Sequence, residues 1–398
     1  MKILHILGSG HIHRNPDAAA LSGVVRATLE YAKRQAALGH EVQVVGFGES
    51  HSSFIWSGVK MVSLKEFSWA QFRLGGRTLD FRRHFPLVIH TLVTKFDVVH
   101  SHMHPYLRLI RGRLRVAHMH IAPLSDAEGK LLPHTRVGLD QLDRQADLVI
   151  AVSQFVQTQL QGQIQQRKIR VVYNGGGFTT EQWDTAQKER DTIRKRLNIP
   201  TDGLLIMYAG AFVLEKGVHH LAQAFASVAE RYPQTYLALA GGGGLWGNNQ
   251  MHDINARKYT EGIETILSSV RGRVHFLGLI PSNQMAEIYA AADMLVIPSV
   301  WQEAFGITAL EGLSGALPVI ASDSGGLVEL VGQGRGLLVA PGDEQALTLA
   351  LEQLISDPEQ RRMLGERGQA YARQAQFTWD QAARQMIELY REHLGGKE

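Results

Sequence analysis

The sequence predicts an α/β protein of two domains, each built on a doubly wound parallel sheet with helices on both faces. Three observations support this prediction. The chain has 398 residues, whereas one domain usually has roughly 100–200. Its short apolar segments are apolar at every position, which is typical of parallel strands buried on both faces. Amphipathic segments separate them, and this repetition of strand and helix indicates doubly wound sheets.

Strands are expected throughout the first half of the chain, each followed by a turn or a helix. Their bounds are Lys2–Leu7, Glu41–Phe47, Val59–Leu64, Asp97–Ser101, Arg115–His120, Asp147–Val152 and Arg170–Tyr173. Ser22–Leu38 is an amphipathic segment between the first two strands, and Gly39 follows it. Glycine commonly ends a helix because it adopts the left-handed conformation without steric cost.

A glycine-rich break at Asn174–Gly177 precedes a second series, which starts with a charged helix at about Gln187–Leu197. Its strands are expected at Leu204–Ala209, Thr235–Ala240, Arg273–Leu277, Met294–Pro298, Pro318–Ala321 and Gly336–Val339. Helices follow at about Asp343–Ser356, Pro358–Gln374 and Trp379–His393. We therefore expect domains at residues 1–175 and 176–376, with 377–398 as a terminal helix that packs back towards the first domain.

Composition excludes several classes of protein. The chain has no cysteine, so it has no disulfide framework, no thiolate zinc site and no cysteine nucleophile. No apolar run reaches the roughly 18 residues of a membrane helix, and the first apolar stretch is too short for a signal peptide. We expect a cytoplasmic protein. Residues 1–175 hold 22 Lys and Arg against 12 Asp and Glu, and the remainder holds 19 against 26.

Glycine turns follow the first strand of each series. Gly8 and Gly10 follow the first strand, and Gly23 opens the next helix. Gly210 ends the first strand of the second series, and Lys216 lies just before a helix. Such turns let the backbone approach a phosphate, but a purely structural turn and a solvated lysine are the alternatives. A dinucleotide fingerprint is incomplete, because His13 stands where G-x-G-x-x-G needs its third glycine.

A pair of carboxylates lies in the most distinctive segment, Pro298–Glu311. Glu303 is expected in the loop after an apolar strand, and Glu311 about two turns into the following helix. Gly325-Gly326 then forms another strand-to-helix turn. The alternative interpretation of the two glutamates is exposed helix charge.

Together these motifs resemble the family-4 retaining glycosyltransferases. The resemblance rests on Lys216-Gly217, Glu303 and Glu311 with seven residues between them, Phe305-Gly306, Gly315-x-x-Pro318 and Gly325-Gly326-x-x-Glu329. It extends in the order of elements over nearly the whole chain. It implies the GT-B fold, in which two Rossmann-like domains face each other across a cleft. It also implies transfer of a sugar from a nucleotide diphosphate sugar, expected to be UDP-linked, with retention and without a cofactor or metal.

The resemblance assigns roles to the residues. Glu303 would contact hydroxyls of the transferred sugar, Glu311 the ribose, and Lys216 the pyrophosphate. The expected catalytic residues are His120, Glu303 and Lys216. The expected donor-binding residues are Gly8, Gly10, Gly23, Gly210, Gly278, Ala304, Phe305, Gly306 and Glu311.

Histidines gather at the ends of two predicted strands. His100, His102 and His104 follow one strand, and His118 and His120 end the other. Such spacing can hold a metal, but no carboxylate motif completes a coordination shell, so no metal site is expected. The resemblance implies an active-site histidine at His120, with His118 as the alternate. A packed strand-end histidine is the other interpretation.

One position departs from the family pattern. Ala211 stands where these enzymes usually have an arginine that accompanies Lys216. Arg14 is the candidate replacement. A nucleotide-sugar-binding protein without turnover therefore stays open, as does another GT-B enzyme such as an epimerase.

The basic first half suggests where an acceptor binds. Aromatic residues alternate there with arginines, at Phe67, Trp69, Phe72, Phe81 and Phe85 and at Arg73, Arg77, Arg82 and Arg83. This pattern suits the inner face of an anionic membrane or a lipid-linked acceptor. A glycan or small-molecule acceptor, with an ordinary solvated face, is the alternative. No motif for nucleic acid accompanies the basic residues.

Overall fold

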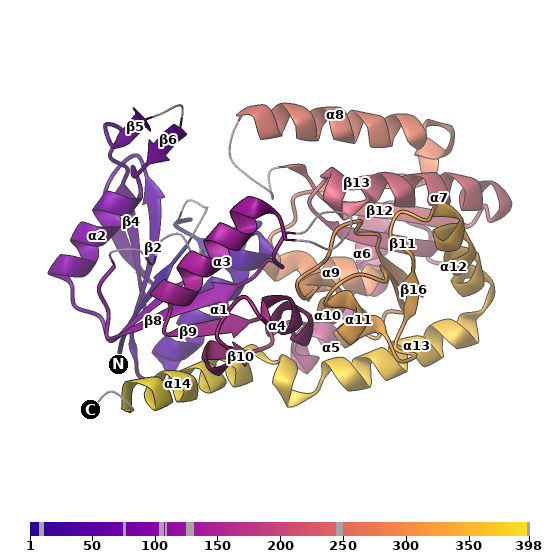
Figure 1. Cartoon of the computed structure of the whole chain (residues 1–398). Helices are drawn as coiled ribbons and strands as arrows, with labels where there is room; N and C mark the ends of the chain where they lie inside the picture. Colours follow the sequence, from indigo (N-terminus) through magenta and orange to yellow (C-terminus); the bar gives the residue numbers. More distant parts are fainter. Residues whose placement is uncertain are drawn as a thin grey trace. The chain divides into compact units, whose positions relative to one another are not determined.

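The computed structural model describes residues 1–7, 12–74, 77–102, 107, 110–124, 131–243 and 250–395, with backbone alone at 72–74, 77–79 and 250–254. The chain forms two compact units (Figure 1). The first contains residues 1–16, 23–175 and 379–398, and the second contains residues 17–22 and 176–378. Each unit is built on its own sheet, which confirms the predicted α/β class with two doubly wound sheets.

The sheet of the first unit has the strand order β10-β9-β8-β7-β1-β2-β4-β3. Its strands are β1 (Lys2–Ile6), β2 (Glu41–Gly48), β3 (Ser52–Trp56), β4 (Val59–Lys65), β7 (Val98–Ser101), β8 (Leu114–Met119), β9 (Leu148–Ala151) and β10 (Ile169–Val171). All neighbours pair in parallel except β3, which forms an antiparallel hairpin with β4. The hairpin turns at Ser57 and Gly58, which both have positive φ, as a tight hairpin turn requires.

A small separate hairpin of β5 (Gln71–Leu74) and β6 (Arg77–Asp80) precedes α2 in the first unit. The helices of this unit are α1 (Gly23–Ala37), α2 (His84–Val93), α3 (Pro133–Gln145), α4 (Gln154–Leu160) and α14 (Trp379–Gly395). The terminal helix α14 packs against α1. Its Tyr390 and Met386 are fully buried, and the ring of Trp379 lies edge-on to that of Tyr31 at 5.2 Å.

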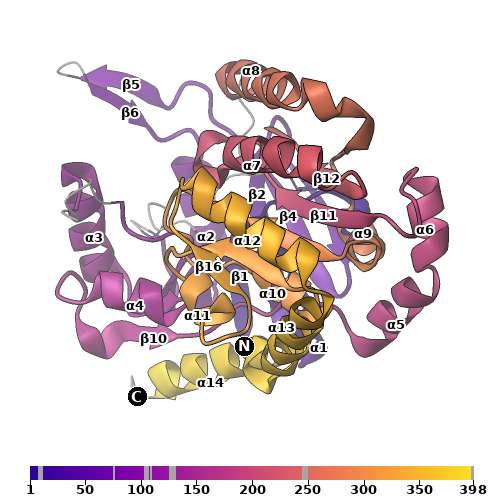
Figure 2. The ribbon, with the colours of Figure 1, turned by 90° about the vertical axis from the view of Figure 1, so that its right-hand side faces the viewer.

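The sheet of the second unit is parallel throughout, in the order β13-β12-β11-β14-β15-β16. Its strands are β11 (Leu204–Gly210), β12 (Thr235–Gly241), β13 (Val274–Gly278), β14 (Met294–Ile297), β15 (Val319–Ser322) and β16 (Leu337–Val339). Its helices are α5 (Thr180–Lys188), α6 (Arg190–Arg196), α7 (Val218–Arg231), α8 (Gln250–Ile266), α9 (Met285–Ala291), α10 (Ile307–Ser314), α11 (Leu327–Val331), α12 (Glu344–Ser356) and α13 (Pro358–Ala372). Helices α7 and α12 lie side by side (Figure 2), and their apolar residues form one core with the strands.

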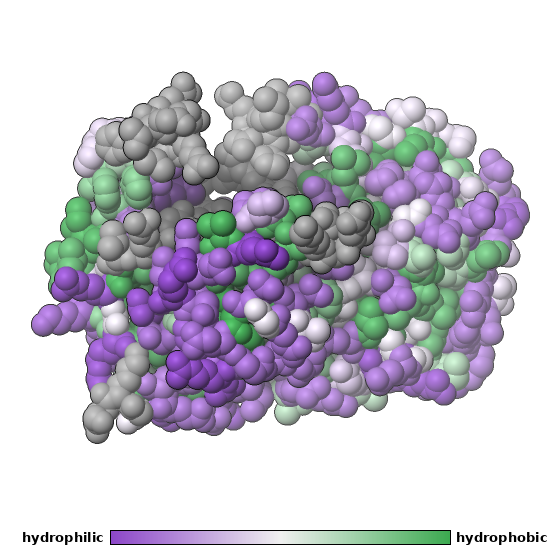
Figure 3. Space-filling model, viewed as in Figure 1, coloured by the Kyte–Doolittle hydropathy of each residue, from purple (hydrophilic) through white to green (hydrophobic). Residues whose placement is uncertain are grey.

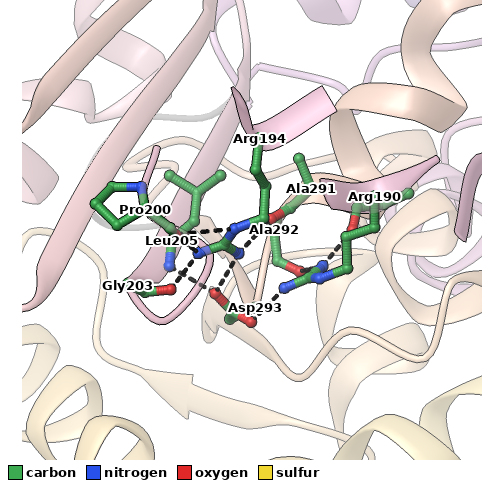
Figure 4. A network of polar contacts seen from close by, with 9 residues as sticks. Arg190, Arg194, Pro200, Gly203, Leu205, Ala291, Ala292 and Asp293 are labelled. Atoms are coloured by element: carbon green, nitrogen blue, oxygen red, sulfur yellow. Dashed lines mark hydrogen bonds and ion pairs between the residues drawn. The ribbon is translucent and has the colours of Figure 1, made fainter. Parts of the chain in front are cut away.

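The helix expected at about Gln187–Leu197 corresponds to α6, which starts three residues later, whereas the preceding helix α5 was not predicted. Helix α5 starts at Thr180, where Thr179 and Gln182 form a capping box. The chain then breaks at Glu189, where α6 starts. Helix α6 carries the buried Arg194, which binds the carbonyls of Pro200, Gly203 and Ala291 and the carboxylate of Asp293 (Figure 4).

Arg190 binds the same carboxylate at 2.6 Å, and Asp293 in turn accepts from the backbone N–H of Leu205 at 2.7 Å (Figure 4). Two guanidinium groups and one strand therefore share a single carboxylate. Such a saturated network offsets the cost of burying Arg194. It attaches α6 to the start of the two central strands, β11 and β14.

Both sheets reverse their strand order at one point. In the first, the chain runs from β1 outwards through β2 and β4 and then returns to place β7 on the other side of β1. In the second, β14 returns to the other side of β11 in the same way. Ligands of open α/β sheets bind outside the carboxyl ends of the strands at such switch points. The fold therefore directs attention to residues that follow β1 and β7, and β11 and β14.

Candidate active site

Lys216 and Glu303 meet at the switch point of the second sheet. Lys216 ends a short 3-10 turn, Leu214–Lys216, after β11, and Glu303 lies in the loop between β14 and α10. The Lys216 Nζ lies 2.6 Å from the Glu303 Oε1, and the Ser299 hydroxyl donates to the same oxygen at 2.6 Å. The Lys216 Nζ is also 5.0 Å from the centre of the Trp301 ring. Lys216 and Glu303, which were predicted as site residues from two separate motifs, are thus in direct contact.

Glu303 is held in its ionised form. Burial by itself would raise the pKa of this carboxyl, since only 8% of the residue is exposed. The charge of Lys216, and hydrogen bonds from Lys216, Ser299 and Trp301, outweigh burial and leave the pKa of Glu303 below its usual value. The site therefore presents a carboxylate and an ammonium group in one largely buried position.

Glycines allow the loops of this site to approach each other. Gly217 follows Lys216 with φ 65°, and a Cβ there would lie 2.0 Å from the carbonyl oxygen of Pro298. Gly325 has φ 59°, and its Cβ would lie 2.2 Å from the Glu303 carbonyl oxygen, to which Gly326 donates its N–H at 2.7 Å. No side chain fits at these distances. The turns after β11 and β15 thus both hold the loop after β14.

Glu311 lies on the buried face of α10. Only 3% of the residue is exposed, and its Oε2 accepts a hydrogen bond from the Tyr289 hydroxyl at 2.9 Å. The alternative interpretation of Glu303 and Glu311 as exposed helix charges is therefore wrong. Gly306, with φ 102°, begins α10, and Ala304 and Phe305 before it are buried.

The other predicted donor-binding glycines are dispersed. Gly210 ends β11 with φ 156°, Gly278 ends β13 with φ 67° and is exposed, and Gly23 is exposed at the start of α1. Gly8 and Gly10 lie outside the described residues. The donor-binding roles of all five glycines stay predictions.

Ala211 is buried, and its carbonyl accepts from the Tyr208 hydroxyl at 2.7 Å. Ala211, at the position where the family pattern has an arginine beside Lys216, therefore supplies no positive charge. Arg14, its candidate replacement, is exposed in the first unit.

His118 and His120 belong to a larger cluster at the switch point of the first sheet. His5 of β1, His100 of β7, and His102 just after it complete the cluster. Sequence reasoning missed His5, because the pairing of β1 with β7 cannot be read from one strand alone. His104 lies outside the described residues. Burial lowers the pKa of His5 to about 4 and that of His120 to about 3, so both rings are neutral near pH 7.

The aromatic and basic segment of the first unit is only partly packed inside. Trp69 is 65% exposed, and its ring lies 5.7 Å from that of Phe67 and 5.9 Å from that of Phe85. Arg82 pairs with Asp80 and Arg83 with Glu66. The side chains of Phe72, Arg73 and Arg77 lie outside the described part.

Apolar side chains also gather over α2 (Figure 3), where Ile89, Leu92 and Val93 are 51%, 48% and 80% exposed. Across the described residues, none of the helices combines the length and apolar character needed to cross a bilayer.

Sequence comparison matches both halves of the chain to families of known proteins. The family described as Glycosyl transferases group 1 matches residues 189–371, and the one described as Glycosyltransferase Family 4 matches residues 21–175. The D-inositol 3-phosphate glycosyltransferase of Corynebacterium urealyticum is 32% identical over 67% of this chain and 62% of that protein, so less than two thirds of its length is spanned. The corresponding protein of Corynebacterium jeikeium is 30% identical over 75% of this chain and 72% of that protein.

Solved structures show the same fold. A sucrose-phosphate synthase from Thermosynechococcus elongatus has a TM-score of 0.78 at 22% identity and full coverage of both chains. Anabaena HepE, solved in complex with UDP and glucose, has a TM-score of 0.74 at 21% identity and covers 98% of this chain and 99% of its own. WaaG, a glycosyltransferase involved in lipopolysaccharide biosynthesis, has a TM-score of 0.74 at 19% identity, with coverage of 98% and 99%. At these identities the likeness establishes the GT-B fold alone.

Proposed function

The chain belongs to the group 1 glycosyl transferases, retaining enzymes of glycosyltransferase family 4, and on that premise we propose which substrates it binds and how. The donor is a nucleotide diphosphate sugar, and the acceptor is a hydroxyl group. The observation that carries this proposal is the contact between Lys216 and Glu303 at the switch point of the second sheet. A cation and a carboxylate at this edge suit the two polar parts of such a donor, its pyrophosphate and its sugar hydroxyls.

Each residue then has a chemical task. Lys216 stabilises the negative charge that develops on the leaving phosphate, and Glu303 accepts hydrogen bonds from sugar hydroxyls. The pyrophosphate competes with Glu303 for Lys216, so donor binding exchanges one ion pair for another. Since Glu303 is engaged by hydroxyls of the donor sugar in this proposal, no carboxylate is placed as a covalent nucleophile. We favour attack on the same face as the leaving group, with a phosphate oxygen taking the acceptor proton and orientation supplying much of the rate.

UDP is the proposed nucleotide. The structural neighbour HepE was solved with UDP and glucose, and separately with UDP-glucose, which supports this choice without extending its activity to this chain. Glu311 accepts from the ribose, and the Tyr289 hydroxyl orients that carboxylate. The backbone at Gly210, Ala304, Phe305 and Gly306 approaches the sugar and phosphate, and Gly278 the base. Gly8, Gly10, Gly23 and His120 are proposed contacts from the first unit.

Calorimetric titration with UDP, ADP and GDP and with their glucose conjugates tests the donor site. A ligand at 100 times its Kd adds about 2.7 kcal/mol to the free energy of unfolding, which thermal unfolding detects independently. We expect one nucleotide to bind, with binding weakened in K216A and E311A and unchanged in K195A. Lys195 is the matched control, because it is an exposed lysine on α6 of the same unit. Equal binding of all nucleotides, or full binding by K216A, would contradict the assignment.

We propose a lipid-linked acceptor reached at an anionic membrane surface, rather than a soluble glycan or small molecule. The support is the exposed apolar group of Trp69, Ile89, Leu92 and Val93 in the basic first unit. Co-sedimentation with vesicles of anionic and neutral lipid tests it. The variant V93D should lose binding and I55D should keep it, since Ile55 is 69% exposed on β3. If the protein sediments with neither lipid, the membrane proposal fails and a soluble acceptor is favoured.

A second candidate is binding of the nucleotide sugar without turnover. Buried Ala211, in place of the second cation, favours it. Saturable donor binding together with neither transfer nor slow hydrolysis of the sugar would support this candidate against the enzyme.

A further inference from the structure

Five histidines share one face of the first sheet. His5 lies opposite His100 in the parallel pairing of β1 and β7. His102 is two residues beyond His100, and His118 and His120 have the same spacing at the end of β8, so each pair points to one face. The rings of neighbouring histidines stack, with centroids 4.1 Å apart for His118 and His120. All but His120 are buried.

Hydrogen bonds fix which nitrogen of His102 carries a lone pair. The Gln35 Oε1 only accepts, so the His5 Nε2–H donates to it at 2.7 Å. The neutral His5 ring then has an unprotonated Nδ1, which accepts from the His102 Nε2–H at 3.0 Å. This leaves the lone pair of His102 on its Nδ1, which lies 2.7 Å from the His120 Nε2.

A second relay orients His118. Its Nε2 is buried and has no hydrogen-bond partner among the described residues. Its Nδ1 lies 3.1 Å from the His100 Nε2, and the His100 Nδ1 lies 2.5 Å from the Tyr390 hydroxyl. The Tyr390 hydroxyl donates to the Met386 sulfur at 3.9 Å, so its oxygen accepts from the His100 Nδ1–H. The unprotonated His100 Nε2 then accepts from the His118 Nδ1–H. The lone pair of His118 then lies on Nε2.

We propose that His102, His118 and His120 bind a divalent transition-metal ion, for which Zn²⁺ is the probe. One ring nitrogen from each of the three lies within 4.8 Å of the other two. In a tetrahedral zinc site with bonds of roughly 2.0–2.1 Å, ligand nitrogens are about 3.4 Å apart. The His102 Nδ1 and the His120 Nε2, now 2.7 Å apart, would therefore separate slightly to admit the ion. The His120 proton moves from Nε2 to Nδ1, and three neutral imidazoles then bind the ion.

The outer residues fit the second shell of such a site. Ligating histidines usually donate their other ring N–H to a fixed acceptor. Here His102 donates to His5, and His118 donates to His100, while Gln35 and Tyr390 hold those two rings. His5 is engaged through both nitrogens, which favours His102, His118 and His120 over the other close group of His5, His100 and His102. The sequence expectation of no metal site is replaced by this proposal.

Three protein ligands leave a fourth position for water or another ligand, and His120, which is partly exposed, marks the open side. The proposal does not depend on the donor site. It does change the proposed role of His120 in donor binding, because a metal ion on its Nε2 would occupy the atom that would otherwise contact the sugar.

The test is titration of Zn²⁺, and of Co²⁺ for its absorption spectrum, into the full chain after treatment with a chelator. We expect one ion per chain and a tetrahedral Co²⁺ spectrum. H120A should abolish both, and H134A should change neither, since His134 is an exposed histidine of the same unit. Y390F and Q35L remove outer partners and should weaken binding by about 10–100-fold. Thermal unfolding of each variant without metal shows whether it is folded.

Absence of stoichiometric Zn²⁺ binding by the folded chain would overturn the proposal, as would full binding by H120A. K216A separates this result from the fate of the donor site. It should lose nucleotide binding and keep Zn²⁺ binding, whereas Y390F should weaken Zn²⁺ binding and keep nucleotide binding. Loss of both in either variant would show an unfolded chain rather than a lost site.

Discussion

The Lys216 ammonium group lies 2.6 Å from the Glu303 carboxylate, although 87 residues separate the two in sequence. Their side chains are only 19% and 11% exposed. Water therefore compensates little for the loss of either partner. The contact joins the ends of β11 and β14, and it connects stability with the proposed donor site.

Replacing Lys216 with alanine leaves the Glu303 carboxylate buried without its cation. Breaking a buried pair costs roughly 3–5 kcal/mol, and we expect the lower end because Ser299 still donates to the carboxylate. Urea unfolding measures this loss. The double variant K216A/E303Q should regain most of the stability, because no charge remains, but not donor binding. A double variant as unstable as K216A would show that the loss comes from packing.

Protonation of Glu303 should contribute to the loss of stability at acid pH. Its folded pKa is lowered, so its contribution is fully present above the unfolded pKa of about 4.3 and is lost as pH falls through the folded pKa. The free energy of unfolding of wild type should therefore fall more steeply than that of E303Q below about pH 4.3. Urea unfolding of both between pH 6 and pH 3 checks this. Parallel curves would mean that Glu303 is not the titrating group.

The buried histidines should destabilise the first unit in mild acid. Burial lowers the pKa of His5 to about 4, so below the unfolded pKa of about 6.5 only the unfolded chain takes up the proton. Stability falls with decreasing pH by about 1.4 kcal/mol per unit for each such group, down to its folded pKa. The variant H5Q should reduce this slope between pH 6.5 and 4, measured by urea unfolding. H134A, with an exposed histidine, should retain it.

Gly217 should not tolerate a side chain. Its φ is 65° and a Cβ would lie 2.0 Å from the Pro298 carbonyl oxygen, so G217A must move the turn that carries Lys216. We expect a loss of about 1–3 kcal/mol and weaker nucleotide binding. G262A is the control, because Gly262 lies in α8 with nothing within 4 Å of its Cβ. G262A should stabilise the chain by about 0.8–1 kcal/mol, because alanine favours a helix more than glycine does. Thermal unfolding measures the stability of both variants, and calorimetric titration measures their nucleotide binding.

Strand prediction succeeded where burial is complete. Strands such as β9 and β14 are buried at every position, and a continuous apolar run is visible in sequence. The edge strand β3 was missed, because its residues are mostly exposed and carry no such run. Helix α5 was also missed, because the capping box at Thr179 and the break at Glu189 depend on a few local bonds.

The sequence by itself determined the α/β class, the buried strands of both sheets and the chemistry of Lys216, Glu303 and Glu311, because burial periodicity and short motifs are local properties of a chain. Only the tertiary structure decided which side chains meet. The order of β11 beside β14 brings Lys216 to Glu303, and the pairing of β1 with β7 and β8 brings His5 to four other histidines. Strand order depends on contacts between segments far apart in sequence, so no local pattern predicts these two groups.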